Sequence, residues 1–511
     1  MPTTLQTAPE TFKAAVKIGV TKPGSWIILI LAALLLPFAN GGHAIALAAW
    51  LAPFFLLRFT RRRRMTIVVP IVLALQMIAL AIQYRGMVPF PTPIYIAVMV
   101  FYGLCFTLPY LGDRLLSDRL PVLTGTLVFP LLLTSIEYLL SLGPFGSWFA
   151  TPYSQYGNLP LLQLLSVTGL SGITFLIGWN ASAGNALWDE WTALGRLPPA
   201  VACALVMIAA ILAGGARLAL FPPNGQTVRV ATLSRIEKEL HPDPKVVGRF
   251  FRHERLTDEE IATIRERSAA IDNDLLSRSE REAKAGARVI FWGEANAPVL
   301  KQDEGDLIRR GGIVAKNNGI YLGLVLASWH LESTPPLENK IVLIQPDGTP
   351  AWEFFKAHPV PGGEAAISRR GNGKLRVLDT PYGRLSSVIC FDADFPQLLA
   401  QAGQLKTDLL LDPSNDWKVI DPWHTRMASF RAVEQGFNLV RHTSQGLSAA
   451  FDYQGRQLAA MDHYLAADRV LVAQVPIHGT RTIYALLGDW FAWLCLAGLA
   501  GVVITAIKLR A

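Results

Sequence analysis

The sequence predicts a multi-span α-helical membrane domain joined to an α/β domain, and three observations lead to this fold class. The 511 residues have a mean hydropathy of +0.33 and are 51% hydrophobic but only 17% charged, which is too apolar for an ordinary soluble protein. The apolar residues gather in residues 1–221 and again after Leu486, in runs near the ~20 residues that cross a bilayer. From Thr227 onward, short β-branched runs alternate with helical stretches.

The net charge of +8 follows the same division of the chain. Residues 229–481 contain 32 Lys or Arg and 32 Asp or Glu, whereas the remainder contains 15 basic and 7 acidic residues. A basic excess confined to the membrane part is typical of a topology signal and not of a nucleic-acid-binding surface. We therefore expect the protein to be embedded in a membrane and to have no nucleic-acid partner.

Eight apolar stretches are predicted to span the membrane. Seven belong to a transmembrane bundle in residues 1–221, a soluble domain occupies residues 222–483, and residues 484–511 form the last span and a short tail. The predicted spans are about 25–39, 43–59, 66–84, 91–111, 121–141, 161–187, 199–220 and 485–507.

Basic residues in alternate loops predict the orientation of these spans. The opposite short loops contain little beyond Arg85. The positive-inside rule then places both termini in the cytoplasm and residues 222–483 on the extracytoplasmic side, the periplasm in a cell with two membranes. The basic residues on the predicted cytoplasmic side are Lys13, Lys17, Lys22, Arg61–Arg64, Arg114, Arg119, Arg196, Lys508 and Arg510.

The loop Gly143–Pro160, GPFGSWFATPYSQYGNLP, has no charge and is rich in aromatic residues and glycine. It is predicted to lie in the outer membrane interface, either as a lipid-contacting segment or as an ordinary aromatic belt.

Within the soluble domain, short apolar runs predict a sheet that helices cover. A capping box at Thr257–Glu260 is expected to begin a helix that ends near Gly286. Further helices are expected over 395–403 and 425–435. The predicted strands are 228–233, 289–292, 320–327, 340–345, 385–389, 408–411, 438–441, 447–451 and 469–475.

Cys390 lies in the stretch RLSSVICFDADFP, between a short apolar strand and a helix. We expect this strand-to-helix turn to expose the cysteine at the edge of the sheet, with the first N–H groups of the turn facing it. Such donors can lower the pKa of a thiol and can hold an oxyanion. A buried structural cysteine is the alternative that this stretch alone leaves open.

Glu294 and Lys356 are the other candidate catalytic residues. Glu294 stands in FWGEANAP at the end of a predicted strand, and Lys356 stands in FFKAHPVPGGE. With Cys390 as a nucleophile, they suit acyl transfer through a thioester. Glu294 would take the thiol proton, and Lys356 with the backbone N–H of Phe391 would stabilise the tetrahedral intermediate. Taken singly, a glutamate or a lysine at such a position is usually a solvated surface residue.

The order Glu, Lys, Cys in the contexts GEANAP, KAHPVPGGE and ICFDADFP resembles the nitrilase (carbon–nitrogen hydrolase) superfamily. The eight-span frame with this domain before the last span is similar to the apolipoprotein N-acyltransferase family. Weaker elements of the resemblance are YSQYG at 153–157, SND at 414–416 and RAVEQG at 431–436.

The resemblance implies an α-β-β-α sandwich in the soluble domain and a location in the bacterial inner membrane. It implies that Glu294 is the general base, that Lys356 stabilises the oxyanion, that Cys390 is the nucleophile and that Glu364 supports the site. The implied reaction moves an acyl chain from a phospholipid to Cys390. The α-amine of a diacylglyceryl-cysteine lipoprotein or lipopeptide then accepts the chain.

Two other functions remain open on the sequence. CFDADFP and SNDWKVID depart from the acyltransferase pattern, which leaves open a membrane-anchored amidase or related carbon–nitrogen hydrolase that uses water or another amine as acceptor. The third reading is a non-catalytic membrane scaffold or transporter that keeps an inactive domain. Asp392 and Asp394 would position either the turn or the acceptor amine. His358, His424 and His442 lack metal-ligand spacing, so neither a metal nor a cofactor is predicted.

Overall fold

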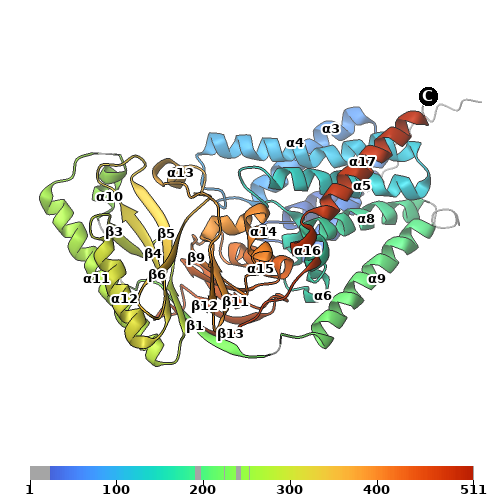
Figure 1. The fold of residues 1–511 in the computed structure, drawn as a ribbon. Coiled ribbons are helices and arrows are strands. Elements are labelled where there is room, and N and C mark those ends of the chain that lie inside the picture. The colour runs from blue at the N-terminus through green and yellow to red at the C-terminus, as the bar shows by residue number, and fades with distance from the viewer. Residues whose placement is uncertain (1–23, 190–196, 224, 237–242, 253, 510–511) are drawn as a thin grey trace, which may run out of the picture.

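A computed structural model describes residues 24–189, 197–223, 225–236, 243–252 and 254–509. It consists of a bundle of apolar helices and, beside it, a domain built from two β-sheets with helices on their outer faces (Figure 1).

The helices of the bundle come from both ends of the chain. Five of the described helices are long and apolar enough to cross a membrane, and a bent pair makes a sixth. The first two predicted spans form shorter helices, so the number of eight spans stays a prediction. The bundle contains α1 (Gly24–Leu35), η1 (Leu36–Phe38), α2 (Ala46–Arg61), α3 (Met65–Gln83), α4 (Thr92–Leu116), η2 (Ser117–Arg119), α5 (Val122–Ser141), η3 (Thr151–Gln155), α6 (Leu159–Leu162), α7 (Leu165–Thr168), α8 (Leu170–Asp189), α9 (Leu197–Leu220) and α17 (Trp490–Lys508).

The predicted span over 161–187 is broken in the structure. The chain bends by 118° between Leu159–Thr168 and Leu170–Trp188. Gly169 at the bend has φ +62°, a left-handed conformation that ends the preceding helix. A Cβ at this position would lie 2.5 Å from the ring of Tyr484, so the glycine also allows the ring to pack against the break.

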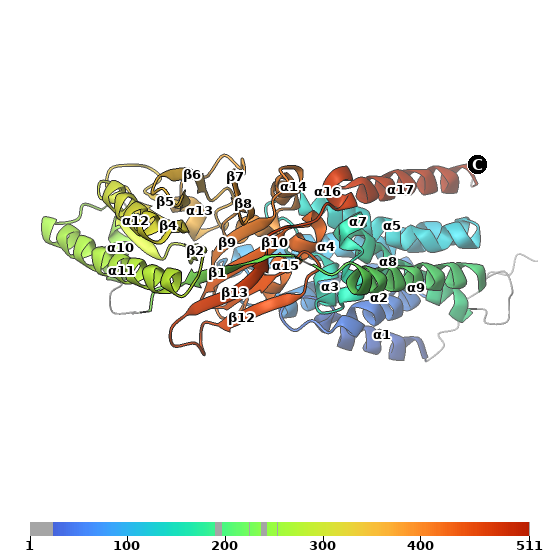
Figure 2. The ribbon, with the colours of Figure 1, turned by 60° about the horizontal axis from the view of Figure 1, so that its bottom comes forward.

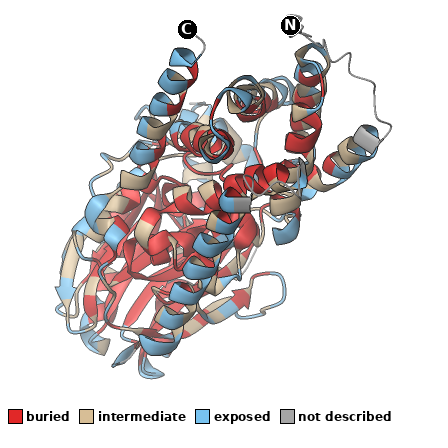
Figure 3. Ribbon diagram, turned by 90° about the vertical axis from the view of Figure 1, so that its right-hand side faces the viewer, coloured by how far each residue is buried: buried red, intermediate tan, exposed pale blue. Residues whose placement is uncertain are grey.

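Helix α17 ends at the same end of the bundle at which α1 begins (Figure 2). Along α17, exposed residues alternate with buried ones (Figure 3). Lys13, Lys17, Lys22, Arg196 and Arg510 lie outside the described residues, and the sidedness of the bundle stays a prediction.

The soluble domain contains two sheets, each with parallel strands at its centre and antiparallel strands at its edges. The first has the order β13-β1-β2-β4-β5-β6, with β3 paired to β4, and the second has the order β12-β11-β10-β9-β8-β7. The strands are β1 (Thr227–Leu233), β2 (Val289–Trp292), β3 (Ala297–Leu300), β4 (Tyr321–Trp329), β5 (Leu337–Ile344), β6 (Pro350–Phe355), β7 (Val377–Thr380), β8 (Gly383–Ser387), β9 (Leu409–Asn415), β10 (Asn438–Ser444), β11 (Leu447–Phe451), β12 (Gln457–Asp462) and β13 (Val470–Pro476).

The two sheets pack face to face. Val228, Val289 and Phe291 of the first sheet share one buried cluster with Leu409 and Val440 of the second. Helices α11 and α12 contact the first sheet, and α15 contacts the second, which gives the α-β-β-α sandwich that the resemblance implied. The helices of this domain are α10 (Pro244–Phe251), α11 (Asp258–Lys284), α12 (Glu304–Asn318), α13 (Gly363–Ile367), η5 (Cys390–Asp394), α14 (Pro396–Gln404), α15 (Trp423–Gln435) and α16 (Ile483–Leu487).

All nine predicted strands are present, and α11 begins with the predicted capping box at Thr257. Strands β3, β6, β7 and β12 were not predicted. Three of them lie at sheet edges, where many side chains face solvent and the sequence therefore lacks a continuous apolar run. β3 is a four-residue strand off the main path of its sheet.

One close contact between the bundle and the sandwich is centred on the backbone carbonyl oxygen of Asp394. The backbone N–H and the hydroxyl of Ser147, from the loop after α5, both donate to it over 2.8 Å. Gly146 has φ +52°, and a Cβ there would lie 2.3 Å from the same oxygen. The close approach therefore requires glycine at this position.

Replacing Gly146 with alanine should loosen this contact. We expect Gly146→Ala to lower the free energy of unfolding by about 1–3 kcal/mol, since the added carbon overlaps a backbone atom. Thermal unfolding of the purified full chain measures the change. Gly157→Ala is the matched control: Gly157 has φ +88°, but no atom lies within 4 Å of its Cβ position, so only conformational strain of about 1 kcal/mol is expected. Equal losses in both variants would contradict the close contact.

Candidate active site

Lys356 lies between two glutamates at one end of the first sheet. Glu294 follows β2 in a tight turn, and Lys356 follows β6 directly. The ammonium group of Lys356 is 2.7 Å from Oε1 of Glu294 and 2.8 Å from Oε2 of Glu364. Lys356 and Glu294 are both buried. The structure thus brings together three of the residues that the sequence predicted.

Asn339 on β5 fixes the two carboxylates, and the sequence analysis missed it. Its side-chain amide donates to Oε1 of Glu294 over 2.7 Å and to Oε1 of Glu364 over 3.2 Å. The backbone N–H of Lys356 donates to the carbonyl of Asn339, because β5 and β6 are paired. An asparagine inside a predicted strand carries little sequence signal, since only strand pairing shows what it faces.

Cys390 begins the 3-10 helix η5 and has φ +52°, a strained conformation for a residue other than glycine. Its backbone N–H donates to Oδ1 of Asp412 over 3.0 Å, and Asp412 in turn forms a buried ion pair with Arg441. The Phe391 N–H belongs to the first turn of this helix, where N–H groups have no partner within the helix. The strand-to-helix turn was predicted correctly.

The prediction that Cys390 is exposed is wrong. Only 4% of its surface is accessible, because Trp148, Phe391 and His424 surround a small pocket beside it. The pocket has a volume of about 30 Å³, and the other lining residues come from both the bundle and the sandwich: Met87, Val88, Pro89, Phe90, Phe145, Val360, Pro361, Trp417 and Ile420.

The loop Gly143–Pro160 takes part in this enclosure and is not a plain interfacial belt. Trp148 and Tyr153 are buried. The ring of Trp148 lies 5.2 Å from that of His424 and 6.3 Å from that of Phe391. The Tyr153 hydroxyl bonds to Ser147 over 2.7 Å and accepts from Arg431 over 3.1 Å. The loop therefore covers the nucleophile from the membrane side.

Asp392 positions the nucleophile turn. Its carboxylate accepts the N–H groups of Ala357, His358 and Ile389 at 2.7–3.2 Å, and it also bonds to Nδ1 of His358. These bonds tie the loop after Lys356 to the turn that holds Cys390. Of the two roles that the sequence left open for Asp392, the geometry favours positioning of the turn.

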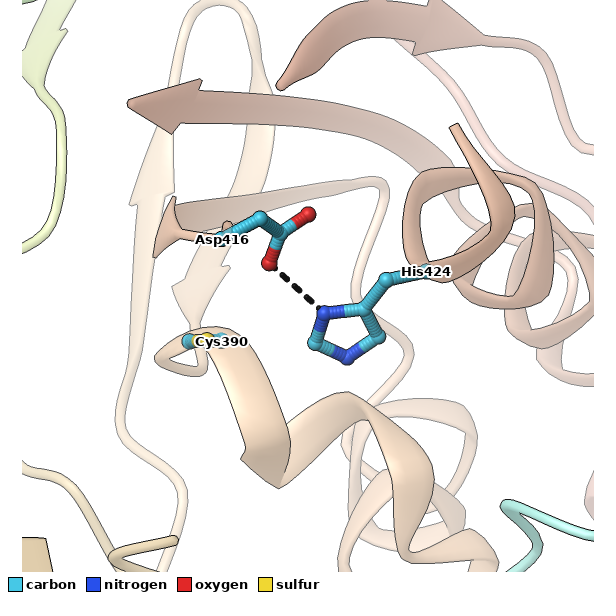
Figure 4. Close-up of side chains that lie close together, drawn as sticks. All are labelled: Cys390, Asp416 and His424. Atoms are coloured by element: carbon cyan, nitrogen blue, oxygen red, sulfur yellow. Dashed lines mark hydrogen bonds and ion pairs between the residues drawn. The ribbon is translucent and has the colours of Figure 1, made fainter. Parts of the chain in front are cut away.

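His424 lies beside Cys390 between two aspartates, and the sequence analysis gave it no role (Figure 4). Its Nδ1 is 2.7 Å from Asp416 and its Nε2 is 3.0 Å from Asp394. A carboxylate only accepts hydrogen bonds, so these two contacts favour an N–H on both nitrogens, whereas a guanidinium nitrogen of Arg441, which only donates, also lies 2.8 Å from Nδ1. Asp416 directly follows β9, as other site residues directly follow strands. This position in the sequence could have been used to predict that Asp416 belongs to the site.

Charges explain the protonation states in this site. Burial raises the pKa of Glu294. The positive charge of Lys356 opposes this rise, and the negative charge of Glu364 adds to it. Burial would lower the pKa of Lys356, but Glu294 and Glu364 raise it well above its ordinary value. Burial and Glu294 raise the pKa of the Cys390 thiol. The resting nucleophile is therefore a thiol, next to a glutamate whose proton affinity is increased.

Burial and Arg441 act to lower the pKa of His424, but Asp416 and Asp394 outweigh them and raise it to about 9. This agrees with the imidazolium that the two carboxylate contacts favour.

Cys390, Asp416 and His424 offer donor atoms that all lie within 4.8 Å of one another. This is a possible set of metal ligands by distance. However, both nitrogens of His424 are already bonded to carboxylates, and a guanidinium nitrogen of Arg441 lies 2.8 Å from its Nδ1. A metal ion would have to displace these contacts.

Two family models match the chain. The model described as the apolipoprotein N-acyltransferase N-terminal domain matches residues 25–183, and the model described as carbon-nitrogen hydrolase matches residues 263–484. Among curated relatives, apolipoprotein N-acyltransferase of Geobacter metallireducens is 29% identical over 420 residues, which cover 75% of this chain and 74% of that protein. The enzyme of the same name from Azotobacter vinelandii is 27% identical over 452 residues, which cover 81% of this chain and 79% of that one.

Among solved structures, an amidase from Nesterenkonia sp. matches 50% of this chain and 92% of its own length, with 18% identity and a TM-score of 0.38.

The charge of His424 should make the stability that it contributes depend on pH. Its pKa of about 9 in the folded protein is above the ordinary 6.5, so its contribution is complete below pH 6.5 and is lost as the pH rises through 9. The shift corresponds to about 3 kcal/mol. We expect the difference in free energy of unfolding between the natural protein and His424→Gln to shrink by about this amount from pH 6 to pH 9.5, as measured by denaturant unfolding.

His478→Gln is the control, because the side chain of His478 is 73% exposed. A difference between the natural protein and His424→Gln that does not change with pH would contradict a buried imidazolium.

Proposed function

Because the chain belongs to the apolipoprotein N-acyltransferase family, with a carbon–nitrogen hydrolase domain, we propose that it transfers an acyl chain from a phospholipid to a lipoprotein. The acceptor is the N-terminal amine of a diacylglyceryl-cysteine. The observation that carries the proposal is Cys390 in a pocket whose apolar wall comes partly from the membrane bundle. A nucleophile placed there can meet an acyl chain that enters from lipid.

The first half-reaction forms a thioester on Cys390. Glu294 takes the proton from the thiol, and the thiolate attacks the carbonyl carbon of the phospholipid ester. The oxyanion of the tetrahedral intermediate is held by the ammonium of Lys356 and the N–H of Phe391. When the intermediate collapses, the C–O bond breaks, and the lysophospholipid leaves with the proton that Glu294 returns.

The second half-reaction transfers the chain to the acceptor. The neutral α-amine attacks the thioester carbonyl, and the same donors hold the second oxyanion. The C–S bond then breaks, the amine gives a proton to Glu294, and this proton returns to the Cys390 sulfur. The amide is formed and the thiol is restored.

Glu364 and Asn339 act as positioning residues in this scheme. The ammonium of Lys356 forms ion pairs with Glu294 and Glu364. It therefore stays charged and in place while Glu294 changes its protonation state. The imidazolium of His424 places a second positive charge near the sulfur, on another element. It supports the thiolate without itself exchanging protons, since both of its N–H groups are bonded to carboxylates.

The topology belongs to the same proposal. Both termini lie in the cytoplasm, and the sandwich lies on the extracytoplasmic face of the bacterial inner membrane, where lipoproteins mature. The basic loops of the sequence support this orientation.

Mass spectrometry of the purified full chain tests the function. After incubation with phospholipid we expect Cys390 to carry one acyl chain, and a diacylated lipopeptide added next should remove that chain and gain its mass. Cys390→Ala should abolish both changes, since the other three cysteines, Cys105, Cys203 and Cys495, lie in helices of the bundle. Cys105→Ala, at a cysteine within α4, is the control and should keep them.

An adduct that hydrolyses without reaching the lipopeptide would contradict the acyltransferase and favour the amidase-type reaction with water. Transfer that persists in Cys390→Ala would contradict the nucleophile.

A further inference from the structure

A second cleft lies next to the bundle, away from the pocket of Cys390. It has a volume of about 610 Å³ and lies between the ends of α14 and α15 and the segment before α16. It shares no lining residue with the pocket beside Cys390. Helix α14 starts just after the nucleophile turn and ends at this cleft, so one helix separates the two sites.

The cleft contains buried polar groups that have no partner in the described structure. Gln435 at the end of α15 is 3% exposed, and neither its amide nitrogen nor its amide oxygen has a hydrogen-bond partner. The hydroxyl of Thr407, which is 5% exposed, has none either. An unpaired buried polar group costs about 1–3 kcal/mol, so a polar group that entered the cleft and bonded to these atoms would be stabilised.

Two cationic side chains of the cleft are also available to bind an anion. Lys406 and Arg481 line it and are exposed, and neither lies within ion-pair distance of a carboxylate in the described part of the chain. The remaining charges are already paired. Arg384 bonds to Asp379 and to the carbonyl of Leu405, and Asp408 accepts the N–H groups of Arg384 and Gly479. Two unpaired cations beside an amide donor suit a phosphate group.

The position of the cleft indicates where this phosphate comes from. Leu486, which lines the cleft, is 82% exposed, and Ile483 and Leu487 of the same short helix are also exposed. This helix, α16, lies between α14 and α17, and α17 is one of the helices able to cross a membrane (Figure 2). Exposed leucine and isoleucine next to lysine and arginine, at the start of a span, are typical of the bilayer surface.

We propose that this cleft binds the headgroup phosphate of a membrane phospholipid that is not the acyl donor. Lys406 and Arg481 bind the phosphate, Gln435 and Thr407 donate to it, and the exposed side chains of α16 lie among the acyl chains. The bound lipid holds the end of α14 on the bilayer. The proposal needs the protein to be in a membrane but does not depend on the acyl-transfer reaction.

Native mass spectrometry of the full chain in detergent, titrated with dioleoylphosphatidylglycerol, tests the site. We expect the natural protein to retain one more lipid than the double variant Lys406→Glu, Arg481→Glu, in which the apparent Kd of that lipid rises by roughly tenfold or more because two charge-assisted contacts are lost. The charge-matched control is Lys284→Glu, Arg288→Glu, at two exposed cations outside the cleft, and it should bind as the natural protein does.

Gln435→Met tests the site without a change of charge, and it should weaken binding by a smaller factor if the amide contacts the headgroup. Acylation of Cys390 is measured in the same samples and should be unchanged in the double variant. Equal lipid binding in the double variant and its control would overturn the proposal. Loss of Cys390 acylation together with the lipid would assign the cleft to the acyl donor instead. Displacement of the lipid by millimolar inorganic phosphate would show a site for soluble anions.

Discussion

The ion pairs of Lys356 with Glu294 and Glu364 are the interaction on which the rest of the site depends. An ammonium removed from water is costly unless carboxylates surround it, and here two of them approach within 2.8 Å. Burial raises the pKa of Glu294; Lys356 and the hydrogen bond from Asn339 oppose this rise, and the negative charge of Glu364 adds to it. The proposed oxyanion donor, Lys356, therefore also depends on the proposed base, Glu294. The pairing of β5 with β6 holds this arrangement, since it places Asn339 and Lys356 side by side.

The sandwich does not complete the site alone. Within the sandwich, Asp412 accepts the backbone N–H of Cys390, and Asp392 accepts the N–H of Ala357. The carbonyl of Asp394 at the end of the same turn accepts a hydrogen bond from Ser147 of the bundle. Trp148 of the same loop covers His424 and Phe391. Two segments about 250 positions apart thus line one pocket, and the candidate site lies at the junction of the bundle and the sandwich.

Much of the fold and the three central residues could be predicted from the sequence. Buried central strands such as β2 and β4 are largely apolar runs, and side chains that follow such strands gather at one edge, which is why Glu294 and Cys390 were found. Edge strands such as β7 lack this pattern and were missed. The enclosure of Cys390 was also missed, because it depends on a loop whose aromatic residues fit lipid and protein equally well by composition. The roles of Asn339 and His424 need strand pairing and helix placement, which no local motif encodes.

The pocket beside Cys390 is small, with a volume of about 30 Å³. An acyl chain needs far more room, so substrate binding has to open the pocket. Its wall is divided between bundle and sandwich: Met87, Phe90 and Trp148 come from the bundle, whereas Cys390 and Phe391 come from the sandwich. The ion pairs of Lys356 and the bonds of Asp392 lie entirely within the sandwich. The base and the oxyanion donors can therefore keep their geometry while the apolar wall moves, which separates the part of the site that must stay rigid from the part that must admit lipid.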